Sequence, residues 1–287
     1  MQPTALPILF AALTVLSASL PAQSPSDSPL AKALTFHASF DHGFDADFSK
    51  GAKACTVRQG KETVPASENA EVKITSDGAK HGKALRFTKK GVTRPQYSGE
   101  GGVLGYNEKS WSATVSVWLK LTPDEDLEPG YCDPVQIVGD DTKKGFIFLE
   151  WSRDERPRFF RYAIRPRVEL WNPENKDWAT MDKRPMVQVA KAPFSRDKWT
   201  HAVFTLERLN EKDAKPTGKL YLNGELQGVI EGWDLTLGWD PAKVALVLGA
   251  SYVGHLDDLA VFNRPLTAEE VKQLGALPGG VADLYGR

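Results

Sequence analysis

Apolar residues occupy every second position over residues 112–121. One face of this segment would carry Ala113, Val115, Val117, Leu119 and Leu121, and the other Thr114, Ser116, Trp118 and Lys120. A period of two residues predicts a β-strand with one face in a core. Similar short apolar segments, separated by Gly, Pro and Asp, recur at 34–40, 84–88, 135–138, 146–151, 159–164, 199–206, 220–222, 245–248 and 256–262. This pattern predicts an all-β sandwich or jelly roll, with two antiparallel sheets packed about 10 Å apart.

The last third of the chain adds a hairpin and one convincing helix. Asn223 and Gly224 separate two strand-like segments, and this pair suits the positive φ angles of a type I′ turn. Thr267 is placed to cap a short helix that stops by Gly275, and Glu270 has the spacing of a capping box. We expect this helix to close one end of the sandwich rather than to form a separate domain.

The order and spacing of six segments resemble one known family. The segments are Phe40-Asp41, 81–87, 111–120, 199–205, 219–226 and 254–266. Together they resemble a laminin-G-like (LamG) domain of the concanavalin A-like lectin/glucanase superfamily, over residues 33–276. The resemblance implies an antiparallel two-sheet jelly roll whose first and last strands lie side by side. Residues 123–197 depart from a minimal pattern and are interpreted as an elaboration, and residues 277–287 as a C-terminal tail.

The N-terminus has the pattern of an export signal. Residues 5–20 are almost wholly apolar, and a small-residue cleavage site follows Ala22. We therefore predict a signal peptide over residues 1–22, with an uncleaved anchor as the alternative. Residues 23–32 are rich in Ser and Pro and would form a disordered leader. The mature chain would then be periplasmic or extracellular, without a membrane span.

The composition of the chain limits the kinds of partner that it is expected to bind. With 287 residues and 41% apolar content, the chain can bury one sizeable core. The formal net charge of −1 gives no electrostatic reason to expect a nucleic acid. Cys55 and Cys132 are the only cysteines, and in an oxidising compartment they would either form a disulfide or remain two buried thiols.

The resemblance also suggests structural calcium. In LamG-like domains a Ca²⁺ ion is often held where the first and last strands meet, and calcium prefers carboxylate and carbonyl oxygens. The positions in this chain that match are Asp41 and Asp257, with Asp47 as a looser candidate. The alternative is that these aspartates accept hydrogen bonds from backbone amides in turns.

Arginine and aromatic residues interleave between positions 151 and 178. The candidate ligand-binding residues are Trp151, Arg158, Arg161, Tyr162, Arg165, Arg167, Trp171 and Trp178. Aromatic rings stack on sugar rings, and arginine recognises carboxylates and sulfates with two hydrogen bonds. The segment therefore suits an acidic polysaccharide. In the alternative interpretation, the aromatic residues are core and the arginines pair with acids on neighbouring strands.

Catalytic motifs of the fold are absent from the sequence. The Glu-x-Asp-x-x-Glu spacing that resembles a retaining glycoside hydrolase does not occur, and Gln136-Ile137-Val138 lacks the histidine of alginate-lyase relatives. His201 lies in a predicted core strand, where we expect it to satisfy local hydrogen bonds. The sequence thus favours an exported, non-catalytic module that binds carbohydrate or another extracellular ligand. Two alternatives stay open: a divergent polysaccharide hydrolase or lyase, and an envelope adhesion protein with a protein partner.

Overall fold

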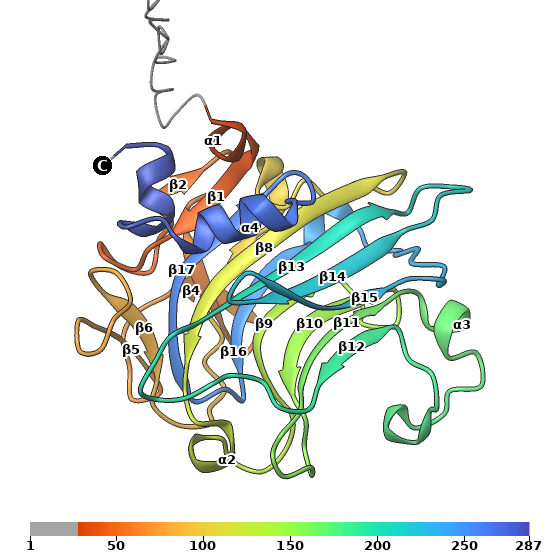
Figure 1. Ribbon diagram of the computed structural model, residues 1–287, viewed down its shortest axis with the longest axis horizontal. Coiled ribbons are helices and arrows are strands. Elements are labelled where there is room, and N and C mark those ends of the chain that lie inside the picture. Colours follow the sequence, from red (N-terminus) through yellow and green to blue (C-terminus); the bar gives the residue numbers. More distant parts are fainter. Residues whose placement is uncertain (1–27, 287) are drawn as a thin grey trace, which may run out of the picture.

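A computed structural model describes residues 28–286 as two antiparallel β-sheets packed face to face (Figure 1). The spatial order of the first sheet is β15 (Glu225–Ile230), β14 (Thr217–Leu222), β13 (Thr200–Leu209), β8 (Trp111–Lys120), β17 (Gly254–Phe262), β1 (Leu34–Ala38) and β2 (Phe48–Ser49). Two further strands extend it from β17, namely β6 (Ala84–Phe87) and then β5 (Val72–Thr75).

The second sheet has eight strands. Their spatial order is β12 (Met186–Val189), β11 (Phe160–Arg165), β10 (Phe146–Trp151), β9 (Cys132–Val138), β16 (Ala245–Ala250), β7 (Gln96–Ser98), β3 (Cys55–Gln59) and β4 (Glu62–Pro65). Short helices lie in the connections: α1 (Pro29–Ala33), η2 (Glu100–Gly102), α2 (Pro123–Asp126), α3 (Val168–Trp171), η3 (Trp178–Thr180), η4 (Pro241–Lys243), α4 (Ala268–Gly275) and η5 (Gly280–Leu284). The predicted all-β fold class is therefore confirmed.

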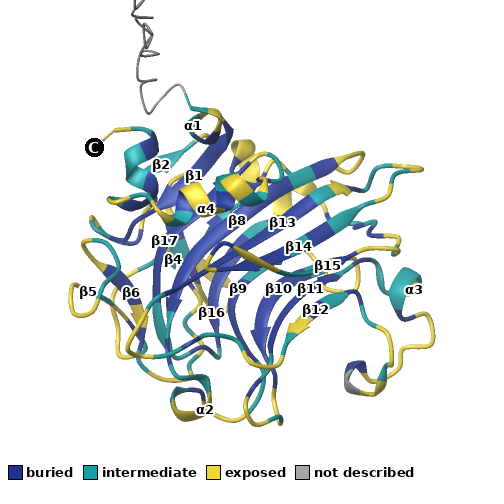
Figure 2. Cartoon of the chain, in the orientation of Figure 1, coloured by how far each residue is buried: buried dark blue, intermediate teal, exposed yellow. Residues whose placement is uncertain are grey.

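The core lies between the two sheets, where each strand contributes every second side chain (Figure 2). In β8 these are Ala113, Val115, Val117 and Leu119, the face that the alternation predicts. The fully buried rings that fill the layer include Trp111, Trp151, Trp239, Tyr97, Tyr162, Tyr252, Phe36, Phe160 and Phe204. Burial of such rings is the main contribution to the stability of the sandwich.

The first and last strands of the sandwich are neighbours, as the resemblance implies. β1 pairs with β17 in antiparallel register, with Phe36 opposite Val261 and Ala38 opposite Leu259. The two ends of the described residues therefore lie close together, at one edge of the first sheet (Figure 1).

Helix α4 covers part of the outer face of the first sheet. The Thr267 hydroxyl accepts a hydrogen bond from the Glu270 amide, and the Glu270 carboxylate accepts one from the Thr267 amide, so the predicted capping box is formed. Val271 and Leu274 of α4 pack on Val203 of β13 in a second apolar cluster. The residues of η5 extend this cover toward the C-terminus.

The structure bears on the predicted boundaries of the signal peptide, the leader and the elaboration in different ways. The signal peptide (1–22) and most of the leader lie outside the described residues. The leader was predicted to be disordered to residue 32, but its described end forms α1, which Ser28 caps. Residues 123–197 are more than an elaboration, because they supply β9, β10, β11 and β12 of the second sheet.

No helix within residues 28–286 is long and apolar enough to cross a bilayer.

The disulfide is not formed, so the alternative of two buried thiols holds. Cys55 lies on β3 and Cys132 on β9, and both are free and buried. Two strands, β16 and β7, separate them in the second sheet. Three strand spacings amount to about 14 Å, well beyond the reach of a disulfide.

Candidate functional site

The outer face of the second sheet carries charged side chains, whereas its inner face is mostly apolar. Strand alternation directs Arg161 and Arg165 of β11 outward, beside Phe146 and Glu150 of β10. The connection from β11 to β12, residues 166–185, passes over this face and includes α3 and η3. This connection brings Trp171 and Trp178 onto the outward side chains.

Trp171, Trp178 and Arg165 meet in one small cavity, which we call the aromatic–arginine pocket. Its volume is about 300 Å³, and it is lined by Thr142, Lys143, Phe146, Arg165, Val168, Trp171, Asn172, Asn175, Lys176 and Trp178. The guanidinium carbon of Arg165 lies 3.6 Å from the ring centre of Trp178 and 5.5 Å from that of Trp171. The two indoles meet edge to face, with centres 5.2 Å apart.

Arg165 is held by rings and not by carboxylates. Among residues 28–286 its guanidinium forms no ion pair, and its buried Nε has no hydrogen-bond partner. The Nε1 of Trp178 is also buried without a partner. Burial lowers the pKa of Arg165 to about 10, so the side chain stays protonated at neutral pH. The pocket thus presents a charged guanidinium whose buried Nε has no hydrogen-bond partner, and on which Glu150 and Asp133 act only from beyond ion-pair distance.

A buried charge cluster lies beside this pocket on the same face. Arg161 donates to Glu150 at 3.2 Å, to Glu155 at 2.9 Å and to Gln188 at 3.0 Å. Asp133 of β9 lies near Glu150, because a bulge shifts the register between Leu149 and Trp151. Burial raises the pKa of Asp133 to about 8, and the charge of Glu150 adds to the rise. Burial also raises the pKa of Glu150, against the opposing effect of Arg161.

Three of the predicted ligand-binding residues are structural instead. Trp151 and Tyr162 point inward, and the Tyr162 hydroxyl donates to the Thr205 carbonyl of the first sheet at 2.9 Å. Arg158 is buried and donates to the carbonyls of Gly130, Ser152, Leu127 and Glu128. These three side chains cannot reach a ligand, because strand direction and backbone contacts turn them away from the surface.

The remaining five predicted residues lie in three places. Arg165, Trp171 and Trp178 share the aromatic–arginine pocket, whereas Arg161 belongs to the buried charge cluster. Arg167 faces solvent in part and lies 3.6 Å from Glu169. The sequence analysis did not single out Lys143, Lys176 or Asp133, which loops and a bulge bring to this face.

The candidate calcium residues accept backbone hydrogen bonds. Asp41 accepts from the Lys83 amide, Asp47 from the Ser39 amide, and Asp257 from the amides of Lys80 and His81. Within residues 28–286, no group of three or more His, Cys, Asp or Glu side chains is arranged to hold a metal ion. Calcium binding by Asp41, Asp47 and Asp257 therefore stays a prediction.

Asp41 and Asp47 line a cavity of about 730 Å³ where the chain ends meet. At its base the buried His37 ring contacts Asp258 through Nε2 at 2.7 Å and the Tyr285 hydroxyl through Nδ1 at 2.6 Å. Asp258 also accepts from the Val281 amide. This network joins the segment after α4 to β1, so we assign it to closure of the fold.

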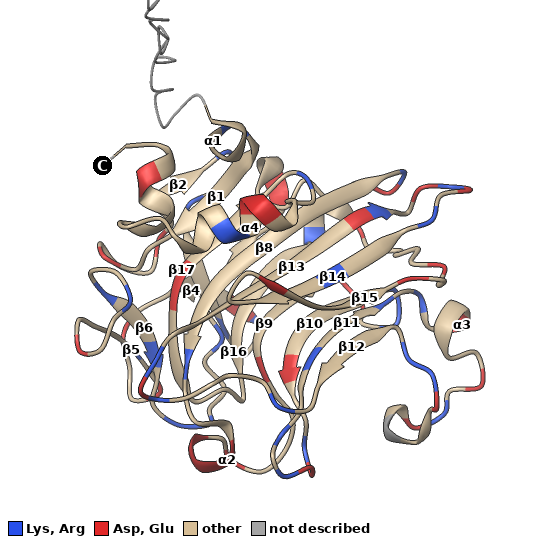
Figure 3. Ribbon diagram, viewed as in Figure 1, with Lys and Arg blue, Asp and Glu red and all other residues tan. Residues whose placement is uncertain are grey.

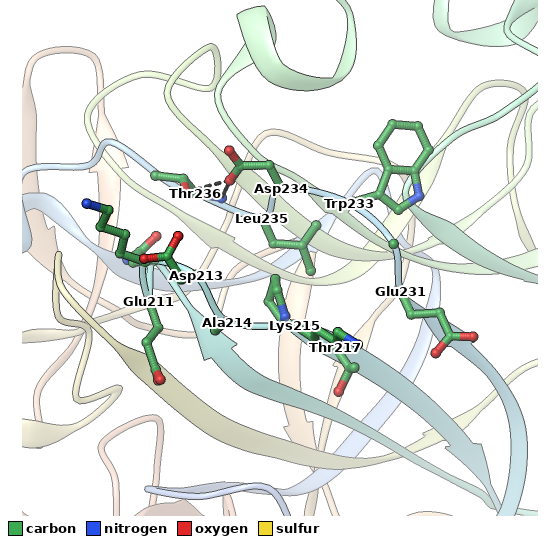
Figure 4. A pocket seen from close by; sticks show the side chains of 14 residues that line it. Glu211, Asp213, Ala214, Lys215, Thr217, Glu231, Trp233, Asp234, Leu235 and Thr236 are labelled. Carbon is green, nitrogen blue, oxygen red and sulfur yellow. Dashed lines mark hydrogen bonds between the residues drawn. The ribbon is translucent and has the colours of Figure 1, made fainter.

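A further cavity of about 900 Å³ lies between the loops 210–217 and 231–236. Figure 4 shows the two segments facing each other, one with Asp213 and Lys215 and the other with Trp233 and Asp234. Asp234 accepts hydrogen bonds from Thr236 of its own loop. The charged side chains here are exposed and of both signs, so the cavity defines no single kind of ligand.

His201 lies on the opposite, first sheet. Its Nε2 is 2.8 Å from the Ser116 hydroxyl, its ring stacks on Trp118, and its buried Nδ1 has no partner. Burial lowers its pKa to about 4. One ring nitrogen therefore forms the expected local hydrogen bond, whereas the other does not.

The chain belongs to the concanavalin A-like lectin/glucanases superfamily. The sequence pattern of this family matches residues 100–272, which include most strands of both sheets. The match confirms the resemblance on which the fold prediction depends. No curated protein matches the chain.

Two solved structures that are similar to this chain were determined with a sugar bound. Domain 4 of AbnA, an extracellular arabinanase from Geobacillus stearothermophilus solved with arabinotriose, is 19% identical with a TM-score of 0.53. The alignment covers 84% of this chain and 98% of that domain. The ligand binding domain of botulinum neurotoxin serotype D, solved with N-acetylneuraminic acid, is 13% identical, with a TM-score of 0.49. There the match covers 79% of this chain and 50% of that structure.

Proposed function

We propose that the mature, exported chain is a non-catalytic carbohydrate-binding module that takes an acidic sugar in the aromatic–arginine pocket. One observation carries the proposal. Arg165 is a half-buried charge that lines a cavity and forms no ion pair among the described residues, and its buried Nε has no hydrogen-bond partner although buried donors are normally satisfied. Glu150 and Asp133 act on its charge only from beyond ion-pair distance. A ligand carboxylate or sulfate would supply the missing partner.

The remaining lining residues fit such a ligand. A carboxylate can accept two parallel hydrogen bonds from a guanidinium, and Trp171 offers an apolar ring against which a sugar can pack. Lys143 and Lys176 add positive charge at the rim, where Lys176 already contacts Glu174. The volume of about 300 Å³ suits one or two sugar units rather than a long segment.

The relatives support carbohydrate as the ligand class. The family includes lectins and glucanases by name, and the arabinanase domain of the same fold was solved with arabinotriose. Fold similarity at 19% identity supplies no ligand identity, so the acidic character of the sugar rests on Arg165.

A polysaccharide hydrolase is the second candidate, and the pair of Asp133 and Glu150 favours it. Glycoside hydrolases use two carboxyl groups on one face, one of which is a general acid with a raised pKa, and burial raises the pKa of both Asp133 and Glu150. However, both side chains are buried, and Glu150 is paired with Arg161. This arrangement leaves them out of contact with a substrate, so we place binding first.

Titration calorimetry with short galacturonate oligomers tests the proposal. We expect Arg165→Gln to weaken binding by about 10- to 100-fold, because a hydrogen-bonded charge pair is lost. Trp171→Ala should weaken it by about tenfold. Arg167→Gln is the matched control, because Arg167 lies two residues after Arg165, in the connection that follows β11, and does not line the pocket.

The outcomes separate the candidates. Equal affinity of Arg165→Gln and the wild-type chain would overturn the proposed site. Preference for a neutral oligosaccharide would overturn the acidic sugar. Release of reducing ends by the wild-type chain, abolished in Glu150→Gln, would establish the hydrolase instead.

A further inference from the structure

Four basic side chains form a continuous row across the first sheet. Lys73 of β5 is opposite Arg86 of β6, Arg86 is opposite His255 of β17, and His255 is opposite Lys120 of β8. Directly opposed residues point to the same face of a sheet. Their neighbours Val72, Leu85, Leu256 and Leu119 point into the core, so this basic row points outward.

The basic row occupies the uncovered end of the face that carries α4. The helix packs over Val203, Ala260 and Phe262, farther along the same strands. Lys73 and Arg86 are exposed, and Lys120 and His255 are half-buried. Figure 3 shows basic positions on β6 and at the lower end of β8, away from α4.

Two acidic side chains, Asp77 and Asp126, line the cavity beside the row, but neither forms an ion pair with it among the described residues. Within residues 28–286, none of Lys73, Arg86 and Lys120 forms an ion pair, and His255 is flanked by two of them. Like charges placed directly opposite each other on adjacent strands destabilise a sheet. At the rim, Asp126 is already paired with Arg196 at 2.5 Å. The directly opposed Lys73 and Arg86 therefore cost stability that a bound anion would restore. Burial lowers the pKa of His255 to about 4, so it stands as a neutral side chain between Arg86 and Lys120 at neutral pH.

The surroundings of the row form a shaped site. A cavity of about 360 Å³ contains Arg86, Lys120 and His255. The carbonyl of Gly78 accepts from the Lys120 amine at 2.7 Å and from the Trp199 indole at 3.1 Å. These bonds hold Lys120 5.4 Å from the ring centre of Trp199, with an aromatic surface at the end of the row.

The geometry points to a second binding site, in which a linear anionic polysaccharide lies across β5, β6, β17 and β8 along the basic row. The three fixed cations and His255 would bind sulfate or carboxylate groups, and Trp199 would pack against a sugar ring. A strand spacing of about 4.8 Å gives the row a length of about 14 Å, enough for several sugar units. A polymer is favoured over a single anion because the cations are spread along a line.

This site is independent of the aromatic–arginine pocket. The pocket lies on the outer face of the second sheet, and the basic row on the outer face of the first. Because the two faces point away from each other, one chain could engage two polymer segments.

A charge-matched pair of double variants tests the second site. Arg86→Gln/Lys120→Gln removes two charges from the row, and Arg58→Gln/Lys61→Gln removes two exposed charges from the β3–β4 hairpin of the other sheet. Binding to dextran sulfate and to polygalacturonate is measured at low and at moderate salt, with neutral dextran as a blank. We expect the first variant to lose roughly tenfold or more in affinity for at least one polymer and the second to bind like the wild type.

Each result decides the matter. Equal weakening by both variants would show a nonspecific charge effect and overturn the site, as would unchanged binding by Arg86→Gln/Lys120→Gln. Tighter binding of single-stranded DNA than of both polysaccharides would overturn the assignment to a polysaccharide. A melting curve confirms that the variant is folded, and Arg165→Gln should retain polymer binding at the row, which keeps this test separate from that of the pocket.

Discussion

At the scale of residues, the alternation of side chains along β11 explains which of its predicted ligand-binding residues point outward. Phe160, Tyr162 and Ile164 of β11 point inward, so Arg161 and Arg165 must point outward. That alternation was present in the sequence and could have removed Tyr162 from the predicted site. The position of Lys176 could not be predicted in the same way, because it depends on the path of the connection after α3.

Asp133 allows a test of the buried charge cluster. Its pKa is raised to about 8 in the folded state, whereas an unfolded aspartate titrates near 4. Between these values the folded state binds more protons, so the free energy of unfolding should fall as pH rises from about 4 to about 8. Asp133→Asn removes this penalty.

We therefore expect Asp133→Asn to match the wild type near pH 4 and to exceed its stability by about 2 kcal/mol or more at pH 8. Denaturant unfolding at several pH values measures the difference, with the exposed Asp154→Asn as the control. A difference that stays constant or shrinks toward pH 8 would contradict the burial of an ionisable group there.

At the scale of elements, predictions succeeded where the pattern was long. The segment 112–121 became β8, the Asn223-Gly224 turn has both φ angles positive, and α4 begins at its predicted cap. Short strands were missed. β4 is a four-residue strand in which three residues are exposed, and β7 has only three residues, so neither shows an alternation long enough to detect.

The capping box makes α4 sensitive to one hydroxyl. Thr267→Ala removes the acceptor for the Glu270 amide, and we expect a loss of about 1 kcal/mol in the free energy of unfolding. Thr267→Ser keeps the oxygen and should restore most of that loss. Chemical denaturation of both variants gives the comparison. Equal destabilisation by alanine and serine would show that the methyl group, rather than the cap, stabilises the helix.

At the scale of the whole molecule, the pairing of β1 with β17 closes the sandwich and leaves two outer faces, one on each sheet, for binding sites. On the outer face of the first sheet, α4 covers an apolar area, and the basic row lies beside it. The second sheet instead displays the aromatic–arginine pocket. The family resemblance predicted this closure from spaced segments, but the pockets depend on loops whose paths no periodic pattern encodes.

The strand order of the second sheet predicts that both thiols stay reduced. Burial raises the pKa of Cys55 to about 12 and that of Cys132 to about 11, so thiolate should be scarce at neutral pH. We expect slow reaction with a thiol reagent in the native state and two reactive thiols after denaturation without reductant. Two thiols that appear only after reduction would show a disulfide and contradict the separation of β3 from β9.

Binding of a ligand anion by Arg165 in the aromatic–arginine pocket can be observed in a crystal structure of the protein with trigalacturonate. We expect a sugar carboxylate within hydrogen-bonding distance of the Arg165 guanidinium, with the sugar ring against Trp171. A sugar bound elsewhere while Arg165 keeps only its aromatic contacts would contradict it.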